Sequence, residues 1–329
     1  MKKLRWGIIS TAGIAQQSLI PALQKSDCAE VVAVASRNID KAEYFARQNN
    51  IPKAYASYEE LLTANDIDVI YNPLPNNLHV PVSIQAIEAG KHVLCEKPLG
   101  MNEDDIKPLL LAAKNHPELV VMEAFMYRFH PQWIRVKELI KSNVLGKINA
   151  VDSSFSYYNV DANNVRHKEN VGGGGLLDIG CYCISASRFI FDKEPKRVVG
   201  ALDIDPNFKV DRHATGILDF APGLANFVIS TQSETSQHVK IVGEQGTLII
   251  ENPFYQGAKT SRLLLTINGE QQVIDCGSCN QYIAQVNAFS NAVFSQTAAP
   301  TPLSDAQANM KVIDAIFKSS ELNSWINIS

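Results

Sequence analysis

The sequence lacks a long apolar run, an excess of charge of one sign and a segment typical of a secretory signal. No apolar run approaches the ~20 residues that a membrane-spanning helix needs, so we expect no membrane partner. The 30 basic and 34 acidic residues give a net charge of −4, which offers no bulk attraction for nucleic acid. The start, Met1 to Trp6, leads directly into a strand-like apolar run, so we expect a cytoplasmic protein.

The six cysteines are scattered and form no pattern typical of a disulfide framework. Without a secretory signal we expect them to be reduced thiols. Cys276 and Cys279 have the C-x-x-C spacing, but a zinc site needs two further ligands. The other close pair, Cys181 and Cys183, lies in a helix-like segment. We therefore expect ordinary packing for these cysteines, and no metal.

A chain of 329 residues with 46% hydrophobic and 19% charged residues is long enough for two ordinary globular domains. In residues 1–122, short β-like runs alternate with helical ones, which is typical of a doubly wound parallel sheet of the Rossmann type. The expected strands are 4–9, 30–35, 69–71, 92–95 and 120–122, and the expected helices are 14–25, 39–49, 77–89 and one after Asn102, with a short helix opened by the capping box at Ser57.

After Glu123 the pattern changes, and we place the domain boundary near residue 122. A helix (131–142), a long strand (147–158) and a second helix (176–191) precede several strand-like runs. The runs are joined by turn signals at 222–223, 244–246 and 268–269. Two helices near 281–295 and 304–320 end the chain. Residues 123–329 therefore predict an α+β domain with a large, mostly antiparallel sheet.

The turn after the first strand has the position of a dinucleotide-binding fingerprint. Compared with G-x-G-x-x-G/A, the residues at the key positions are Ser10, Ala12 and Ala15, all small, although only the last matches the pattern. A helix start with small residues still presents free N–H groups to a pyrophosphate. The predicted contacts are Ser10, Thr11, Ala12, Gly13 and Ile14. A tight turn that binds nothing remains the alternative.

The end of the second strand indicates which dinucleotide is bound. An NAD-preferring fold usually has Asp or Glu there to hold the ribose 2′-hydroxyl. This chain has Ser36 and Arg37, with Lys41 one turn into the next helix. A hydroxyl and two cations suit a 2′-phosphate, which favours NADP, with NAD as the alternative cofactor. The two cations could also be ordinary solvated surface charges.

Lys97 follows the apolar run 92–95 within Glu96-Lys97-Pro98. A strand that ends there places Lys97 at the carboxyl edge of a parallel sheet, where open α/β folds bind ligands. A lysine in such a crevice can hydrogen-bond or protonate a substrate oxygen. The alternative is a surface ion pair next to a proline.

Taken together, these motifs resemble the Gfo/Idh/MocA oxidoreductases, and most closely the branch of dimeric dihydrodiol dehydrogenase and NADP-linked D-xylose dehydrogenase. The similarity covers essentially the whole chain and thins after about residue 200. The segments that carry it are 5–8, 35–37, 96–100, 123–131 and 173–182. The resemblance implies an NAD(P)-binding domain followed by a substrate-binding and oligomerisation domain with an open sheet face, giving a homodimer or a dimer of dimers.

The resemblance also implies the catalytic residues. Lys97 contacts the reacting oxygen and the nicotinamide ribose, and Tyr182 is the acid/base, with Asp178 four residues earlier on the same helix face. Oxidation of an alcohol requires a hydride acceptor and a base for the hydroxyl proton. A nearby lysine stabilises the developing alkoxide and makes a phenol a usable base. A tyrosine packed in the core and a carboxylate capping the helix are the structural alternatives.

The remaining predicted contacts lie on both domains. Cofactor contacts are expected at Asn72, Leu74, Asn77, His79, Glu96, Lys97 and Arg128, although Asn77 could instead cap its helix and Arg128 could form a plain salt bridge. Substrate contacts are expected at Lys97, Arg166, His167, Asp178 and Tyr182. Gly172 to Gly175 either allow close approach of a ligand or form a flexible lead-in.

We therefore predict an NAD(P)-dependent oxidoreductase that transfers hydride between nicotinamide C4 and a carbinol or carbonyl carbon of a sugar, polyol or dihydrodiol-like substrate. Rival hypotheses are an NAD-linked member with a different substrate, a non-catalytic NADP-binding regulator or sensor on the same fold, and an interaction protein without a cofactor. Retention of both Lys97 and Tyr182 argues against a sensor. The sequence alone does not identify the substrate.

Overall fold

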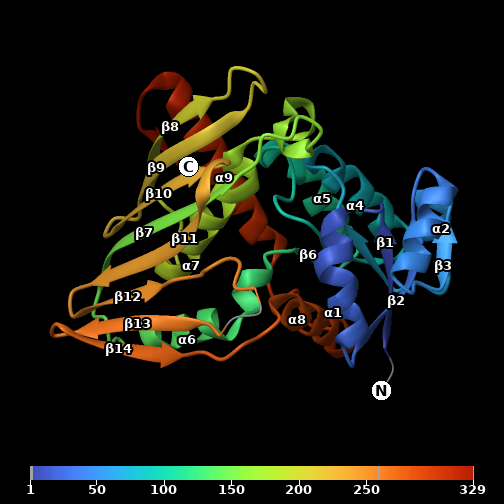
Figure 1. The fold of residues 1–329 in the computed structure, drawn as a ribbon, viewed down its shortest axis with the longest axis horizontal. Helices are drawn as coiled ribbons and strands as arrows, with labels where there is room; N and C mark the ends of the chain where they lie inside the picture. Colours follow the sequence, from blue (N-terminus) through green and yellow to red (C-terminus); the bar gives the residue numbers. More distant parts are fainter. Residues whose placement is uncertain (1–2, 258–259, 329) are drawn as a thin grey trace. The chain divides into compact units, whose positions relative to one another are not determined.

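The structure is a computed structural model that describes residues 3–257 and 260–328. The chain forms two compact units. The first unit comprises Met1–Met126 and Asn280–Gln307, and the second comprises Tyr127–Cys279 and Ala308–Ser329. Each unit has its own sheet (Figure 1).

The sheet of the first unit has six strands, all of which pair in parallel. Its order, β3-β2-β1-β4-β5-β6, reverses between β1 and β4, which is the topological switch point where doubly wound folds bind dinucleotides. The strands are β1 (Leu4–Ile9), β2 (Ala29–Ala35), β3 (Lys53–Tyr55), β4 (Val69–Asn72), β5 (His92–Cys95) and β6 (Val121–Glu123).

The helices within residues 3–126 connect successive strands, and two of them start at the predicted N-caps. They are the π-helical turn η1 (Ala15–Leu19) with α1 (Ile20–Lys25), α2 (Ile39–Gln48), α3 (Tyr58–Thr63), α4 (His79–Glu88) and α5 (Glu103–Asn115). Ser57 Oγ accepts the N–H of Glu60, and Asn102 Oδ1 accepts the N–H of Asp105. Both N-caps were predicted, and the structure confirms them.

Residues 280–307 were predicted within the second domain, but they belong to the first unit. Helix α8 (Gln281–Ser295) packs against α1 and β2. Trp6 is fully buried and its ring lies 5.3 Å from that of Phe289 on α8, while Ser26 Oγ donates to Asn287 Oδ1 at 2.8 Å. The apolar spacing of α8 shows that the helix is amphipathic, but it does not show which sheet the helix covers. The sequence therefore could not reveal that the chain returns to the first unit.

The sheet of the second unit has nine strands in the order β14-β13-β12-β11-β7-β10-β9-β8-β15. Among the described strands, β7 and β10 are the one parallel pair, so the sheet is mostly antiparallel. The predicted turns at 222–223, 244–246 and 268–269 join successive strands, and the predicted fold class is confirmed. The strands are β7 (Ile148–Tyr158), β8 (Arg197–Ile204), β9 (Asp211–Asp219), β10 (Leu224–Ser230), β11 (Gln232–Gly243), β12 (Gly246–Ile250), β13 (Arg262–Ile267), β14 (Glu270–Asp275) and β15 (Ile326–Asn327).

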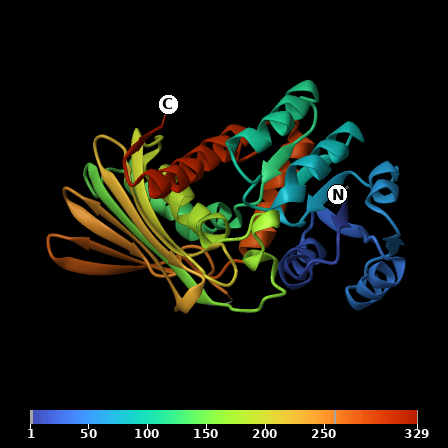
Figure 2. The same cartoon turned by 90° about the horizontal axis from the view of Figure 1, so that it is seen from above.

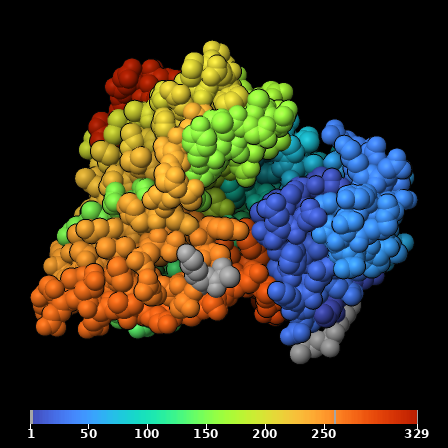
Figure 3. Space-filling view, viewed as in Figure 1, coloured from blue at the N-terminus to red at the C-terminus, as the bar shows by residue number. Residues whose placement is uncertain are grey.

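In the described part of the chain, helices cover one face of this sheet and no helix covers the other (Figure 2). Helix α7 (Cys181–Phe191) packs on β7 and β10, and α9 (Leu303–Leu322) brings Ile316 against Gly200 and Gly216. A Cβ at Gly200 would lie 2.8 Å from Ile316, so these glycines allow the close approach of α9. In Figure 3 the yellow and orange part of the chain, which contains most strands of this sheet, lies at the visible surface.

Two further observations concern membranes and metals. Among residues 3–257 and 260–328, no helix combines the length and the apolar character needed to span a bilayer. In the same described ranges, no cluster of three or more His, Cys, Asp or Glu side chains is arranged to hold a metal ion, and the six cysteines are free thiols.

Candidate active site

The turn after β1 lies at the switch point of the first sheet and carries a strained residue. Ser10 has φ 70°, a left-handed conformation that favours glycine, and its N–H donates to Ala35 O at 2.9 Å. Its hydroxyl is buried and is among the described side-chain atoms without a hydrogen-bond partner. A buried hydroxyl without a partner is costly in a finished fold. The turn therefore fits a polar ligand such as a pyrophosphate.

The end of β2 carries the two predicted cations. Arg37 and Lys41 are exposed, and the ion pairs of the described residues include neither. Asn38 caps α2 by accepting the N–H of Lys41, and Ser36 is buried with its Oγ accepting the N–H of Asn38. Burial raises the pKa of Tyr58, and the nearby charge of Arg37 opposes this shift. The residues present fit a 2′-phosphate.

The segment after β4 is held by hydrogen bonds of the buried Asn72 side chain. The Asn72 side chain is buried and donates from Nδ2 to His79 O and Ser83 Oγ, at 3.0 and 3.2 Å, while its Oδ1 accepts the N–H of Leu74. Asn72 therefore fixes the loop from inside. Asn77 does not cap α4, because the N-terminus of that helix has no side-chain cap. The Oδ1 of Asn77 and the Oγ of Ser10 are both buried without a partner in the described structure, so Asn77 fits a ligand contact.

His79 differs from its prediction. Its side chain is 1% exposed, and its ring nitrogens lie 2.7 Å from Pro98 O and 2.6 Å from Leu74 O. Burial lowers its pKa to about 4, although the two carbonyls oppose that shift. No ring nitrogen is left for a cofactor, contrary to the prediction. The His79 ring instead lies between carbonyls of the loops after β4 and β5, and the single N–H of the neutral ring donates to one of them.

The loop after β5 carries Glu96 and Lys97 at the carboxyl edge of the sheet, as predicted. Glu96 N donates to Asn72 O at 3.0 Å, and Tyr71 OH donates to Glu96 Oε1 at 2.5 Å. Burial, and then the charge of Glu96, raises the pKa of Tyr71, which therefore stays a neutral donor. Leu99 N donates to the buried carboxylate of Glu123 at 2.7 Å. The half-buried Lys97 is thus held on a loop anchored on both sides.

In the second unit, Asp178 and Tyr182 lie one turn apart. Asp178 belongs to the π-helical turn η6 (Leu176–Gly180), and Tyr182 to α7, which follows it directly. Asp211 on β9 holds the start of this helix, since its Oδ2 accepts the N–H of Leu176 at 2.6 Å. A Cβ at Gly174, which has φ +113°, would lie 2.1 Å from Asp211 Oδ1. Only glycine fits this position.

Asp178 accepts two strong hydrogen bonds on the same oxygen. Its Oδ2 lies 2.6 Å from Tyr157 OH and 2.8 Å from Arg166 Nε. The charge of Asp178 is the main cause of the raised pKa of Arg166, to which Tyr157 and Tyr182 also contribute. Burial, then the charge of Asp178, raises the pKa of Tyr157. Asp178 is therefore an ionised acceptor whose orientation is set by two donors.

The ring of Tyr182 lies in an aromatic cluster and is 6% exposed. Its centroid lies 5.9 Å from Tyr127, 5.6 Å from Phe155 and 5.4 Å from Phe254. Tyr127 OH hydrogen-bonds Ser185 Oγ at 2.7 Å, and Arg128 Nη2 donates to the same oxygen, also at 2.7 Å. These contacts fix the plane of the Tyr182 ring. The cofactor contact expected of Arg128 stays a prediction.

The loop before η6 packs differently from what its sequence suggested. His167 is buried at 6% exposure, stacks on Phe208 at 4.2 Å and places Nε2 3.2 Å from Asn159 Oδ1, so we assign it to holding the loop rather than to substrate contact. A Cβ at Gly173 would lie 2.6 Å from Arg166 O. The glycines therefore serve close packing of the chain against itself rather than approach of a ligand.

Three residues of these two clusters were missed from the sequence: Tyr71, Tyr157 and Asp211. Each binds a residue that is far away in the sequence, so no local motif marks it. The one signal in the sequence was that each is a polar residue near the end of a strand. Tyr71 also directly precedes Asn72, which was predicted to contact the cofactor.

A parallel sheet in this order, a small-residue turn at its switch point and a lysine at its carboxyl edge define the class of Rossmann-type oxidoreductases. Residues 4–124 match the oxidoreductase family with an NAD-binding Rossmann fold, Gfo/Idh/MocA, and residues 133–249 match the C-terminal domain of the same family. The chain belongs to the Gfo/Idh/MocA family, which confirms the resemblance noted in the sequence.

Similar proteins include enzymes of the expected branch. The chain is 34% identical to D-xylose 1-dehydrogenase (NADP(+)) 2 of Haloferax volcanii, over 99% of this chain and 100% of that protein. It is 35% identical to trans-1,2-dihydrobenzene-1,2-diol dehydrogenase of Xenopus laevis, over 82% and 81% of the two chains. A 3-ketoreductase of Actinomadura kijaniata, solved with NADP and TDP-benzene, has a TM-score of 0.91 at 28% identity, covering 97% and 98% of the two chains.

The protein is therefore an NAD(P)-dependent oxidoreductase that acts on CH–OH groups, as the sequence predicted. Its first unit binds the dinucleotide, and its substrate is a small molecule.

The buried carboxyl of Asp211 gives a testable dependence of stability on pH. Burial raises its pKa to about 6 from an ordinary 3.8. The folded state therefore binds a proton between these values that the unfolded state does not, so stability falls as the pH rises from about 4 to 6, by on the order of 2–3 kcal/mol. Asp211→Asn carries no charge and should lose this part of the pH dependence.

Urea unfolding at pH 4, 5, 6 and 7 measures how the free energy of unfolding depends on pH. The control is Glu270→Gln, at an exposed position. Parallel stability profiles for the Asp211→Asn variant and the unaltered protein would contradict the assignment.

Proposed function

We propose that the protein is an NADP-preferring oxidoreductase of a sugar, polyol or related small hydroxy or keto compound. The observation that carries this proposal is the loop after β5, which holds Lys97 at the carboxyl edge of the dinucleotide-binding sheet. The two exposed cations at the end of β2, which are in no ion pair between described residues, support NADP over NAD. The names of the relatives, which include a D-xylose dehydrogenase and a dihydrodiol dehydrogenase, support a substrate with several hydroxyl groups.

The proposed cofactor contacts are the turn after β1, the end of β2 and the loops after β4 and β5. The residues are Ser10, Thr11, Ala12, Gly13, Ile14, Ser36, Arg37, Lys41, Asn72, Leu74, Asn77, Glu96 and Lys97, with Arg128 from the second unit. Ser10 Oγ and Asn77 Oδ1 are buried without partners in the described structure, which supports a polar ligand there. When bound, the dinucleotide supplies the hydride acceptor for oxidation or the hydride donor for reduction.

The proposed proton chemistry divides between Lys97 and Tyr182. The ammonium of Lys97 stabilises negative charge on the substrate oxygen, and the phenol of Tyr182 takes the proton in oxidation or gives it in reduction. Arg166 is electrostatically coupled to Tyr182 and favours its ionised form. We assign Asp178 a positioning role, because its Oδ2 accepts from both Tyr157 and Arg166. Its role is to position Arg166 beside the phenol.

Two rivals remain for experiment. A regulator on the same fold would bind NADP without turnover, and an NAD-linked enzyme would prefer the other dinucleotide. The cytoplasmic location expected from the sequence stays a prediction.

We also propose that the uncovered face of the nine-stranded sheet forms a homodimer, or a dimer of dimers. Val228, Leu224 and Ile217 are 55%, 49% and 38% exposed on neighbouring strands β10 and β9 of this face. Apolar side chains adjacent on a sheet face without a helix favour burial against a second copy.

The first prediction concerns the 2′-phosphate. Arg37→Asp should weaken NADPH binding by about tenfold or more and leave NADH binding within about twofold, because a carboxylate repels the phosphate. Fluorescence titration with each dinucleotide measures it. Arg47→Asp, the same change at the other end of α2, is the control. Equal losses for NADPH and NADH would refute the role of Arg37.

A second prediction concerns catalysis. Lys97→Ala should lower turnover at least about 10²-fold, since a positioned group for proton transfer or charge stabilisation contributes 10²–10⁴-fold, and should leave a folded protein that binds NADPH. Initial rates on the best substrate of a sugar and polyol screen measure it. Lys107→Ala, at an exposed lysine of the same unit, is the control. Ordinary turnover in Lys97→Ala would remove the lysine from the mechanism.

A third prediction concerns assembly. Val228→Asp should convert the dimer to a monomer, because it places a charge on the apolar part of the sheet face. Light scattering after size-exclusion chromatography measures the mass. Leu111→Asp, at a 60% exposed leucine on α5, should leave the mass unchanged. A monomeric unaltered protein, or a dimer unaffected by Val228→Asp, would rule out this face.

A further inference from the structure

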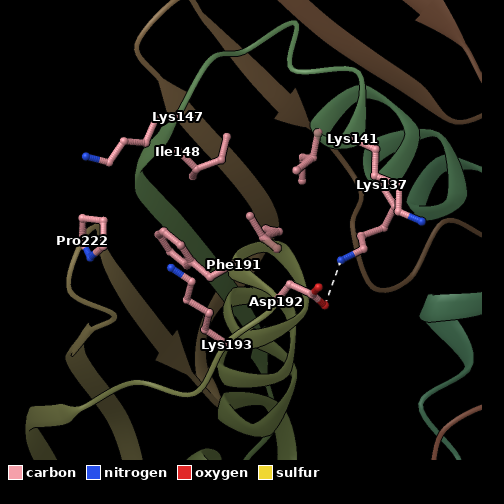
Figure 4. Close-up of a pocket in the computed structure, with 10 residues that line it drawn as sticks. Lys137, Lys141, Lys147, Ile148, Phe191, Asp192, Lys193 and Pro222 are labelled. Carbon is pink, nitrogen blue, oxygen red and sulfur yellow. Dashed lines mark hydrogen bonds and ion pairs between the residues drawn. The ribbon is translucent and has the colours of Figure 1, made fainter.

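A pocket in the second unit lies apart from the cluster of Asp178 and Tyr182. Its volume is about 230 Å³, and it lies where the end of α7 approaches α6 (Pro131–Lys141), the start of β7 and the turn before β10. The pocket has an apolar interior and a basic rim (Figure 4). It is lined by Ile140, Ile148, Ile190, Phe191 and Pro222, and by Lys137, Lys141, Lys147, Lys193 and Asp192.

The apolar wall is held rigidly. Phe191 stacks on Phe220 at 4.3 Å with 18° between the rings, and a Cβ at Gly223 would lie 2.4 Å from the Phe191 ring. Gly223 has φ +101°, which favours glycine. The aromatic wall is therefore preformed and can receive a flat or aliphatic group without rearrangement.

The charges of the rim are not balanced. Lys137 donates to Phe189 O at 2.9 Å and pairs with Asp192 at 3.4 Å (Figure 4), so its ammonium is already occupied. Lys141, Lys147 and Lys193 are exposed and take part in none of the ion pairs between described residues.

Three further acids lie near these lysines, and two of them are bound to arginines; the third, Glu244, whose N–H donates to Lys147 O at 3.0 Å, is exposed and in no ion pair between described residues. Glu138 pairs with Arg135 at 2.8 Å, and Glu194 accepts two hydrogen bonds from Arg188, at 2.6 and 2.7 Å. Three lysines thus concentrate positive charge around an apolar pocket in a chain whose net charge is −4. Such an arrangement attracts an anion and disfavours a cation.

We propose that this pocket binds a small phosphate monoester with an apolar or aromatic group. The apolar group contacts Phe191, Ile148 and Ile140, and the phosphate interacts with Lys147 and Lys193 at the rim. More than one unpaired lysine favours a dianion over a carboxylate, since each added charge strengthens the attraction. The volume of the pocket limits the apolar group to about the size of one ring. This site is separate from the proposed cofactor contacts.

Phenyl phosphate is the probe, titrated by isothermal calorimetry into the protein saturated with NADP⁺ so that the dinucleotide site is already filled. Inorganic phosphate and phenol represent its two halves. We expect saturable binding of phenyl phosphate and at least about tenfold weaker binding of either half. The double variant Lys147→Gln/Lys193→Gln should weaken phenyl phosphate binding by about tenfold.

Lys240→Gln/Lys318→Gln is the matched control, because it removes the same charge from exposed positions of β11 and α9. Ile148→Thr tests the apolar wall and should weaken phenyl phosphate without changing the binding of inorganic phosphate. Absence of saturable binding, equal binding of inorganic phosphate, or an unchanged affinity in the Lys147→Gln/Lys193→Gln variant would each overturn the proposal.

Discussion

The hydrogen bonds that join the loops after β4 and β5 are the constraint on which the dinucleotide-binding edge depends. Asn72 and His79 are both buried: Asn72 bonds the main chain at Leu74 and His79, and the His79 ring lies between the carbonyls of Leu74 and Pro98. A loop held in this way cannot move without leaving buried polar groups unpaired, which costs about 1–3 kcal/mol for each group. Lys97 lies directly before Pro98, so its backbone position follows from these bonds.

The second unit uses the same principle at the start of one helix. The carboxylate of Asp211 holds the N–H of Leu176, and the glycines beside it remove side chains that would prevent this approach. Asp178 then accepts hydrogen bonds from Tyr157 on β7 and from Arg166 in the loop before η6. In both units, the residues proposed to act on substrate are therefore positioned by buried polar side chains that do not themselves take part in the chemistry.

Much of the fold could be predicted from the sequence because its signals are local. Strand β5 and the N-caps Ser57 and Asn102 follow directly from apolar runs and short polar side chains. The roles of His79 and His167 could not be predicted, since the surroundings of a buried ring depend on carbonyls and aromatic rings from other loops. Residues 280–307 pack in the first unit for a similar reason: helical spacing identifies an apolar face but not the surface that it covers.

The motifs at Ser10, Arg37 and Lys97 indicated a dinucleotide and a redox lysine because they follow strands of one parallel sheet, whose carboxyl ends share an edge. The account is tested most directly by fluorescence titration of the unaltered protein with NADPH and with NADH. Tight binding of NADPH with at least about tenfold weaker binding of NADH is the predicted result. Failure to bind either dinucleotide would contradict the assignment of the turn at Ser10, and the proposed chemistry of Lys97 with it.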